Sequence, residues 1–320
     1  MNNNLTQLVE VTDHKIMTNL NESRNDLINL GITARRNGEP EKALEYFKKV
    51  ILKYPKHFSG YVQARVQLQQ LKRFDEASQC INKLLDQDPH YLDVFMKDRP
   101  GRINILSKIN KATSYLEIGV ADGTTFLQIM IKKKIAVDPK FRFNYLDHQS
   151  EYIKLYEITS DEFFRTKTPE VFDFIYLDGL HTFEQTFRDF CATLTIAHEK
   201  TIWLIDDTVP SDKFAADRSQ QRCNQLRRAD GIEGKAWMGD VFKVVYAIHD
   251  FFPQFNYATF TGHGQTVIWR ETRTDFKPHR DSLSAITDLS YLDFLETKEK
   301  IMNFADDNEI IARLKHGLDN

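Results

Sequence analysis

The chain has 320 residues, of which 41% are hydrophobic, and its 43 basic and 46 acidic side chains give a formal net charge of −3. This composition is typical of a globular protein of about two domains and excludes a disordered chain. The near-neutral charge argues against nucleic-acid binding that depends on neutralising phosphates. We expect no membrane span, because no segment approaches ~18 consecutive apolar residues. The amino-terminal sequence also has no secretory pattern.

Cysteine and glycine usage narrows the class further. Cys80, Cys191 and Cys223 are an odd number without a CxxC pair. They predict neither a disulfide framework nor a cysteine zinc site, and they fit a reducing, cytoplasmic compartment. Glycine is scarce, with 13 residues in the chain, which predicts few strained turns and much helix.

An internal repeat marks the first hundred residues. Pro55 and Pro89 are 34 positions apart, and apolar residues recur between them at helical spacing. This pattern resembles the tetratricopeptide repeat, with units at about 24–57 and 58–91. The matching positions are Leu27, Leu30, Gly31, Ala34, Ala43, Phe47 and Pro55 in the first unit, and Tyr61, Ala64, Ala77 and Pro89 in the second.

Two repeats are fewer than the three that usually make a stable stack. The sequence therefore predicts a cap, either a helix from residues 1–20 or the next domain. The resemblance implies a groove for a partner peptide or a surface for self-association, for example as a homodimer. A helical cap packed against a catalytic domain is the alternative, and the repeat residues do not decide between them.

Strands alternate with helices after the Arg99-Pro100-Gly101 segment. The predicted strands are 114–120, 134–138, 152–158, 172–178 and 201–207, and the predicted helices are 124–132, 160–166, 182–198, 217–229 and 240–252. This alternation predicts a doubly wound α/β sheet of the Rossmann-like kind. Two final strand candidates, 256–262 and 265–270, are joined by a short turn at 262–264. They predict an antiparallel hairpin at the edge of the sheet.

A glycine-containing turn follows the first predicted strand. Gly119 and Gly123 would let the backbone turn tightly and approach a ligand at the start of the next helix. The dinucleotide fingerprint GxGxxG is not met, because Ala121 stands at its second glycine and Thr124 at its third. The next strand ends in Asp138, about 20 residues beyond the turn, where an acid can accept hydrogen bonds from ribose hydroxyls. A helix cap or a surface acid is the alternative for Asp138.

The same region resembles the first motif of class I S-adenosylmethionine-dependent methyltransferases. Glu117, at the end of the first strand, can face the cationic amino group of the methionine part. Ser160 and Asp161 could reach the adenine amino group, although an N-cap of the next helix suits them equally well. The expected cofactor contacts are Glu117, Gly119, Gly123, Thr124, Asp138, Ser160, Asp161 and Asp178.

Three aspartates and a histidine follow the fourth and fifth predicted strands. Asp178 and His181 lie in the sequence Asp-Gly-Leu-His, and Asp206 and Asp207 end the next strand. Because ligands bind beyond the carboxyl ends of strands in open α/β sheets, we expect these side chains to converge. Three close carboxylates repel one another, and a divalent cation such as Mg²⁺ would compensate their charge. His181 suits proton transfer near neutral pH.

This combination resembles the metal-dependent sugar O-methyltransferases, a class I group that includes macrolide O-methyltransferases. In that group a DGxH or DGD motif ends one strand and an Asp-Asp pair ends the next. The resemblance implies Asp178, Asp206 and Asp207 as ligands of Mg²⁺ or Mn²⁺ and His181 as the general base. The sequence departs from the DGD form at Leu180, so the expected base is histidine rather than aspartate.

Simpler interpretations stay open for these four residues. Asp206 and Asp207 could cap a helix and contact ribose or adenosine without any metal. His181 could be a helix-start residue that bonds to Thr182 or Glu184 and takes no part in chemistry.

The polar segment 208–240 is a candidate lid over the acceptor site. In that interpretation Arg218 and Arg222 hold a phosphate or carboxylate of the substrate, and Trp237 and Asp240 line the acceptor pocket. A solvated amphipathic surface helix is the alternative.

The sequence thus predicts a repeat domain at 1–99, a class I methyltransferase domain at 100–275, and an amphipathic helical tail at 276–320 that docks or dimerises. The favoured function is an S-adenosylmethionine- and metal-dependent O-methyltransferase acting on a sugar hydroxyl of a glycan or nucleotide sugar. One alternative is a metal-independent methyltransferase acting on a protein or small metabolite. Another is a catalytically idle S-adenosylmethionine-binding scaffold with a peptide-binding repeat domain.

Overall fold

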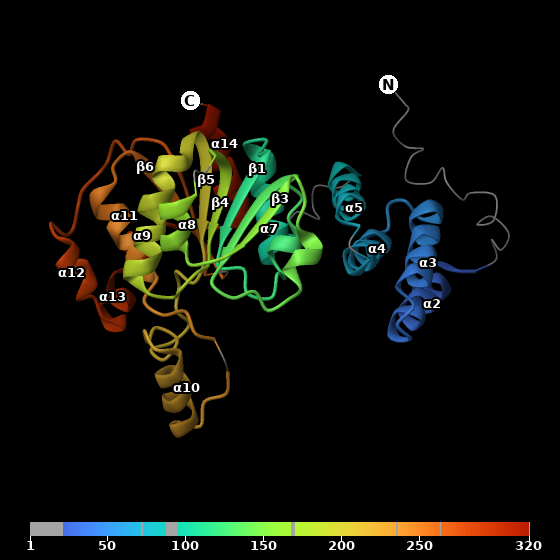
Figure 1. Cartoon of the computed structure of the whole chain (residues 1–320), viewed down its shortest axis with the longest axis horizontal. Coiled ribbons are helices and arrows are strands. Elements are labelled where there is room, and N and C mark those ends of the chain that lie inside the picture. Colours follow the sequence, from blue (N-terminus) through green and yellow to red (C-terminus); the bar gives the residue numbers. More distant parts are fainter. Residues whose placement is uncertain are drawn as a thin grey trace. The chain divides into compact units, whose positions relative to one another are not determined.

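The computed structural model describes residues 22–71, 73–87, 95–167, 170–234, 236–262 and 264–319. The chain divides into two compact units, Met1–Phe95 and Met96–Asn320 (Figure 1). Three sequence expectations lie outside the described residues: the cap at 1–20, Pro89 at the end of the second repeat, and His263 in the expected hairpin turn.

The amino-terminal unit consists of helices that pack in chain order. They are α2 (Arg24–Arg36), α3 (Pro40–Lys53), α4 (Phe58–Gln70) and α5 (Phe74–Gln87), and each contacts the next. Local signals explain where they begin. Ser23 forms a capping box with Asp26 before α2, and Pro40 occupies the first turn of α3. The predicted all-α repeat region is confirmed.

Most of the described repeat positions form the core of this unit, and the exceptions are Leu30 and Pro55, which are exposed. A Cβ at Gly31 would collide with the ring of Phe47, so glycine lets helices α2 and α3 approach closely. Leu30, which the repeat alignment places beside Gly31, is 36% exposed and lies outside the core. The buried repeat positions are Leu27, Gly31, Ala34, Ala43, Phe47, Tyr61, Ala64 and Ala77.

The second unit is built on an eight-stranded sheet with the order β3-β2-β1-β4-β5-β7-β6-β8. Strands β1 to β5 are parallel, whereas β7 runs antiparallel between β5 and β6. The predicted doubly wound sheet with a final antiparallel hairpin is therefore confirmed. The strands are β1 (Ser114–Ile118), β2 (Lys133–Asp138), β3 (Ile153–Glu157), β4 (Phe172–Leu177), β5 (Ala197–Ile205), β6 (Phe255–Phe260), β7 (Thr266–Arg270) and β8 (Phe304–Ala305).

Helices cover both faces of this sheet (Figure 1). Helices α8 (Ser160–Thr166), α9 (Phe183–Thr193) and α11 (Phe242–Phe251) lie on one face, and α7 (Arg99–Ile109) and α14 (Asp307–Asp319) lie on the other. The remaining helices of this unit are α10 (Gln220–Ala229), α12 (Leu283–Thr287) and α13 (Tyr291–Ile301). No helix among the described residues is long and apolar enough to cross a membrane.

The helix predicted at 124–132 is wrong, because the structure has only the short 3₁₀ turn η2 (Phe126–Gln128) there. Side chains from distant positions take the backbone groups that a helix would use. Asn104 accepts a hydrogen bond from the Met130 amide at 2.8 Å. Lys134 donates to two carbonyl groups of the segment at 3.1 and 3.0 Å. These partners replace helical hydrogen bonds and hold the segment open.

Two other helix predictions need correction. The helix expected at 182–198 ends at Thr193, and Ala197 already pairs with Phe172 as the first residue of β5. The amphipathic tail is not one helix, because strand β8 separates α13 from α14. Asn303 breaks the helix with φ +51°, and the chain then adds to the edge of β6 through bonds such as Thr259 N–H to the Asn303 carbonyl at 3.1 Å.

Candidate active site

A cavity of about 960 Å³ opens at the carboxyl ends of the parallel strands. The turns after β1, β2, β3 and β4 line it, together with the start of α7 and the side chains of Gln185, Asp189 and Trp237. This is where open α/β sheets bind ligands. The sequence-predicted residues Glu117, Gly119, Thr124, Asp138, Ser160, Asp161, Asp178 and His181 all line this cavity.

The turn after β1 requires glycine at its first position. Gly119 has φ +86°, and a Cβ there would overlap the backbone carbonyl of Asp178 in the neighbouring strand-end turn. Gly123 closes the turn with φ +79°, and Thr124 lies beside it on the cavity wall with its amide donating to Asp122 at 3.0 Å. The absence of a side chain at Gly119 therefore lets the turn after β1 pack closely against the turn after β4.

Asp138, at the end of β2, organises this turn. Its Oδ2 accepts the amides of Val120 at 2.8 Å and Ala121 at 2.9 Å, and its Oδ1 accepts the Lys140 amide at 2.7 Å. A carboxylate has about four acceptor positions, so these bonds leave one free. Asp138 thus fixes the glycine turn and still has an acceptor position for a ligand.

Glu117 lies at the floor of the cavity and is almost fully buried, with 1% of its surface exposed. The hydroxyl of Tyr115 donates a hydrogen bond to its Oε2 at 2.5 Å. Burial raises the pKa of Glu117 to about 8, although the bond from Tyr115 opposes the shift. A cationic ligand group beside Glu117 would favour its charged form.

Ser160 and Asp161 begin α8, but neither is its N-cap. Thr159 caps the helix by accepting the Glu162 amide. Ser160 and Asp161 instead accept hydrogen bonds from the side-chain amide (Nε2) of Gln185, at 3.2 and 3.1 Å. The helix-cap interpretation is therefore wrong for these two residues.

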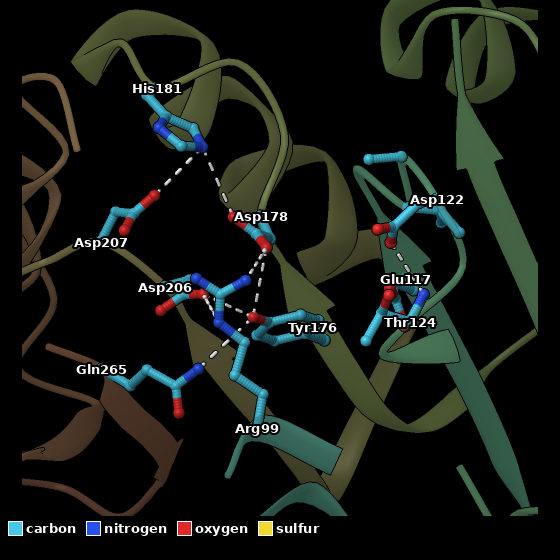
Figure 2. Close-up of polar contacts among 12 residues, drawn as sticks. Arg99, Glu117, Asp122, Thr124, Tyr176, Asp178, His181, Asp206, Asp207 and Gln265 are labelled. Atoms are coloured by element: carbon cyan, nitrogen blue, oxygen red, sulfur yellow. Dashed lines mark hydrogen bonds and ion pairs between the residues drawn. The ribbon is translucent and has the colours of Figure 1, made fainter. Parts of the chain in front are cut away.

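The acidic cluster contains one group whose ligand atoms converge. Among the described residues, one oxygen each of Asp178 and Asp207 and a ring nitrogen of His181 lie within 4.8 Å of one another. His181 Nε2 is 3.0 Å from Asp207 Oδ2 and 3.5 Å from Asp178 Oδ1 (Figure 2). These groups have the spacing of a metal site or of a proton-transfer cluster.

Arg99 reaches the cluster from the end opposite His181 (Figure 2). Its Nε is 2.7 Å from Asp206 Oδ2, and its Nη1 is 3.3 Å from Asp178 Oδ2. The hydroxyl of Tyr176 also donates to Asp206 Oδ2, at 2.7 Å. Asp206 is therefore bound to protein groups, whereas the sequence predicts it as a metal ligand.

Burial and mutual repulsion shift the pKa values of this cluster. Burial is the largest cause that raises the pKa of Asp206 and Asp207, followed by neighbouring carboxylate charge. Burial lowers the pKa of His181, but Asp178 and Asp207 outweigh it and raise the pKa to about 9. A cation that neutralised these carboxylates would favour the neutral form of the His181 imidazole.

Trp237 holds the imidazole of His181. The ring centroids are 4.6 Å apart in a stacked geometry, and His181 Nδ1 lies 2.9 Å from the Trp237 carbonyl oxygen. Gly239 permits this approach, because a Cβ there would overlap the His181 carbonyl. Of the expected acceptor residues, Trp237 therefore borders both the cavity and the histidine.

The other expected acceptor residues are engaged in ion pairs. Arg218 forms two hydrogen bonds to Glu184, at 2.9 and 2.6 Å, and Arg222 lies 3.2 Å from Asp217. Asp240 is 2% exposed and accepts the amide at the start of α9. Arg218, Arg222 and Asp240 are not among the residues that line the cavity. Arg218 and Asp240 tie the segment 208–240 to α9, whereas the pair of Arg222 with Asp217 lies within the segment.

Sequence reasoning missed Arg99, Tyr176, Gln185 and Asp189. Tyr176 was open to prediction, because it lies two residues before Asp178 on β4 and therefore shares its face of the sheet. Arg99 stands in the Arg-Pro-Gly segment at the start of α7, and no local pattern ties it to the strand ends.

Family models match two parts of the chain. Residues 116–208 match a methyltransferase domain, and residues 25–57 match a tetratricopeptide repeat. The sheet unit therefore contains a methyltransferase domain, and the protein is a methyltransferase. No curated protein matches the sequence.

Solved methyltransferases show a distant likeness. The O-methyltransferase from Bacillus cereus, in complex with SAH, is 13% identical over 62% of this chain and 99% of its own, with a TM-score of 0.38. SAH-bound PaMTH1 from Podospora anserina is 13% identical over 65% of this chain and 87% of its own, with a TM-score of 0.40. TomG from Streptomyces achromogenes, in complex with SAM, is 12% identical over 53% of this chain and 78% of its own, with a TM-score of 0.34.

Proposed function

We propose that the chain is an S-adenosylmethionine- and divalent-metal-dependent O-methyltransferase that acts on a sugar hydroxyl. One observation carries the proposal: a single cavity of about 960 Å³ borders both the glycine turn after β1 and the Asp178–His181 turn after β4. This volume lies in the range of small-molecule sites, roughly 300–1,000 Å³. A methyl donor and an acceptor hydroxyl could meet within it.

The cavity lining fits S-adenosylmethionine, whose sulfonium supplies the methyl group. Gly119 lines the cavity, and Asp138 keeps an acceptor position for a ribose hydroxyl. The buried carboxyl of Glu117 suits the cationic amino group. Ser160 and Asp161 would serve the adenine end of the cavity. The carboxyl groups of Glu117 and Asp138 in one cavity support this assignment.

The residues beside this cavity fit a divalent cation, Mg²⁺ or Mn²⁺; Asp178 and His181 line the cavity, whereas Asp207 is not among its lining residues. Asp178 and Asp207 would hold it, because their oxygens and His181 Nε2 converge within 4.8 Å. The ion would orient two adjacent sugar hydroxyls and lower the pKa of the one that reacts. Asp206 is the third ligand expected from sequence, but its Oδ2 is shared between Arg99 and Tyr176.

His181 would serve as the general base. A carbonyl oxygen only accepts hydrogen bonds, so the contact with the Trp237 carbonyl at 2.9 Å places a proton on Nδ1. Nε2 is then the ring atom that can take a proton. In this proposal the hydroxyl oxygen attacks the methyl carbon, the bond from that carbon to the sulfonium sulfur breaks, and S-adenosylhomocysteine leaves. Nε2 of His181 receives the proton of the acceptor hydroxyl.

A methyl-transfer assay tests this function. The full chain would be incubated with S-adenosylmethionine carrying a labelled methyl group and a panel of sugars and nucleotide sugars, with Mg²⁺ or with a chelator. Transfer to a sugar that depends on Mg²⁺ supports the proposal. Transfer that is unchanged by the chelator favours a metal-independent methyltransferase, for which the pairing of Arg99 with Asp206 is the supporting observation.

The repeat unit suggests a protein partner in addition. We propose that α2–α5 bind a peptide or a second copy of the chain, as tetratricopeptide repeats do. We also propose that the enzyme works in the cytoplasm. Co-purification of a partner that depends on residues 24–91 would support this role.

A further inference from the structure

The three carboxylates of the acidic cluster have different partners. Asp206 Oδ2 lies 2.7 Å from Arg99 Nε, whereas Asp207 Oδ2 lies 3.0 Å from His181 Nε2. Asp178 lies between them, with Oδ2 3.3 Å from Arg99 Nη1 and Oδ1 3.5 Å from His181 Nε2. The cluster thus has one end bound to a guanidinium and another that faces the histidine (Figure 2).

A chain of buried polar groups fixes Asp206 further. The Tyr176 hydroxyl donates to Asp206 at 2.7 Å, and the Gln265 amide donates to that hydroxyl at 3.4 Å. The guanidinium of Arg102, which is 2% exposed, donates in turn to the Gln265 carbonyl oxygen. Turning Asp206 toward a metal would break its bonds to Arg99 and Tyr176, and buried polar groups are costly to leave unpaired.

The backbone distinguishes the two neighbouring aspartates. Asp207 has φ +58°, in the left-handed region that non-glycine residues rarely adopt. Such a conformation persists where the surrounding structure demands it, often at functional sites. Here it accompanies the placement of Asp207 beside His181, away from Arg99. Asp206, the first residue after β5, lies against Tyr176, and its amide donates to the Leu177 carbonyl of β4 at 3.0 Å.

We infer that Arg99 is a positioning residue of this site: it is the permanent counter-ion of Asp206, so that a divalent cation is held by Asp178 and Asp207 and not by Asp206. The inference rests on the proposed metal-dependent function. This assignment also balances the charges of the cluster, because the guanidinium of Arg99 is always protonated and neutralises one carboxylate. Three carboxylates with one guanidinium leave two negative charges, which a single divalent ion balances.

Direct Mn²⁺ binding tests the inference without an activity assay. The dissociation constant would be measured on the full chain by electron paramagnetic resonance of free Mn²⁺. The test variant is Arg99→Met with Asp206→Asn, which removes the ion pair without changing net charge. The matched control is Asp207→Asn, the same substitution one residue later. Circular dichroism would verify folding, and Arg99→Gln with Asp206→Asn is the second variant if the first unfolds.

The double variant is expected to change the Mn²⁺ dissociation constant by less than about tenfold, because it removes no ligand and leaves the net charge of the cluster unchanged. Asp207→Asn is expected to weaken binding by about a hundredfold or more, because it removes a ligand. Arg99→Met alone is expected to tighten binding about threefold or more, because it adds uncompensated negative charge. A merely structural arginine would not tighten it.

Equal loss of Mn²⁺ binding in the double variant and in Asp207→Asn would overturn the inference, because Asp206 would then be a ligand. Weaker binding in Arg99→Met alone would overturn the role of Arg99 as counter-ion. Absence of Mn²⁺ binding in the wild-type chain would instead contradict the metal part of the proposed function, and the inference would fall with it.

Discussion

At the scale of single residues, His181 is the side chain on which the proposed chemistry depends. We expect His181→Ala to lower kcat by about 10²–10⁴-fold, the usual contribution of a general base. S-Adenosylmethionine affinity should stay unchanged, because the contacts of His181 are with Asp207, Asp178 and Trp237 rather than with the glycine turn. Calorimetry and turnover measured on the same protein check both parts.

The matched control is His198→Ala. His198 lies at the amino end of β5, at the opposite ends of the strands from the candidate site, and its ring bonds to Asp173 at 2.8 Å. This variant should retain turnover. Equal loss of turnover and cofactor affinity in His181→Ala would refute the assigned role.

Asp173 lies at the amino end of β4, away from the candidate site, and has a structural role. Its carboxylate accepts bonds from Thr113 and Ser114 between 2.7 and 3.0 Å and contacts His198. Burial opposes the shift, but these bonds outweigh it and lower the pKa of Asp173 to about 2. Its stabilising effect is therefore complete above the unfolded-state pKa, about 3.9, and is lost as the pH falls toward 2.

We expect Asp173→Asn to destabilise the α/β unit by about 1–3 kcal/mol at pH 7, the contribution of hydrogen bonds to a charged group. The difference from wild type should shrink as the pH falls from 4 to 2. Thermal unfolding across this range measures it. A variant as stable as wild type at pH 7 would show that these bonds contribute nothing.

The sequence was enough to predict the residues of the candidate site that follow strands, but not those that come from other elements. Asp178, His181 and Asp207 directly follow apolar strands, so the rule that ligands bind at strand ends was enough to bring them together. Arg99 could not be found in this way, because it reaches Asp206 from a helix 79 residues before Asp178. Its role depends on how α7 packs against the sheet.

At the scale of elements, the segment 208–240 places Trp237 on His181, and Gly239 makes this contact possible. Gly239 has φ +61°, and a Cβ there would overlap the His181 carbonyl. We expect Gly239→Ala to reduce turnover by about tenfold or more, because even a 1 Å misplacement can cost about 10²-fold. Steady-state kinetics measures the effect.

Gly231→Ala is the matched control in the same segment. Gly231 has a similar φ of +66°, but a Cβ there meets nothing within 4 Å. It should cost about 1 kcal/mol of stability for the left-handed backbone and leave turnover nearly unchanged. Equal effects of the two substitutions would show that the contact with His181 does not matter.

Strands were predicted better than helices for a physical reason. Buried parallel strands are continuous apolar runs, so 114–120 and 172–178 needed only local sequence. The failed helix at 124–132 has suitable residues, but Asn104 and Lys134 capture its backbone groups. Such partners are remote in sequence, and local periodicity does not report them.

At the scale of the whole molecule, every residue that lines the cavity belongs to the unit Met96–Asn320. We therefore expect a chain that begins at residue 96 to bind S-adenosylmethionine with a dissociation constant within about threefold of that of the full chain. The corresponding difference in binding free energy is smaller than the roughly 1.4 kcal/mol of a tenfold change. Calorimetry on both chains measures this. A folded truncated chain that fails to bind would show that the repeat unit is needed to form the site.

Every step of the proposed function depends on the binding of S-adenosylmethionine in the cavity at the strand ends. Titration of the full chain with this compound in a calorimeter tests it most directly, once with Mg²⁺ and once with a chelator. We predict one bound molecule per chain in both conditions, because Gly119, Asp138 and Glu117 lie on the β1–β2 side of the cavity and the metal site lies beyond β4. Absence of binding in both titrations would contradict the account.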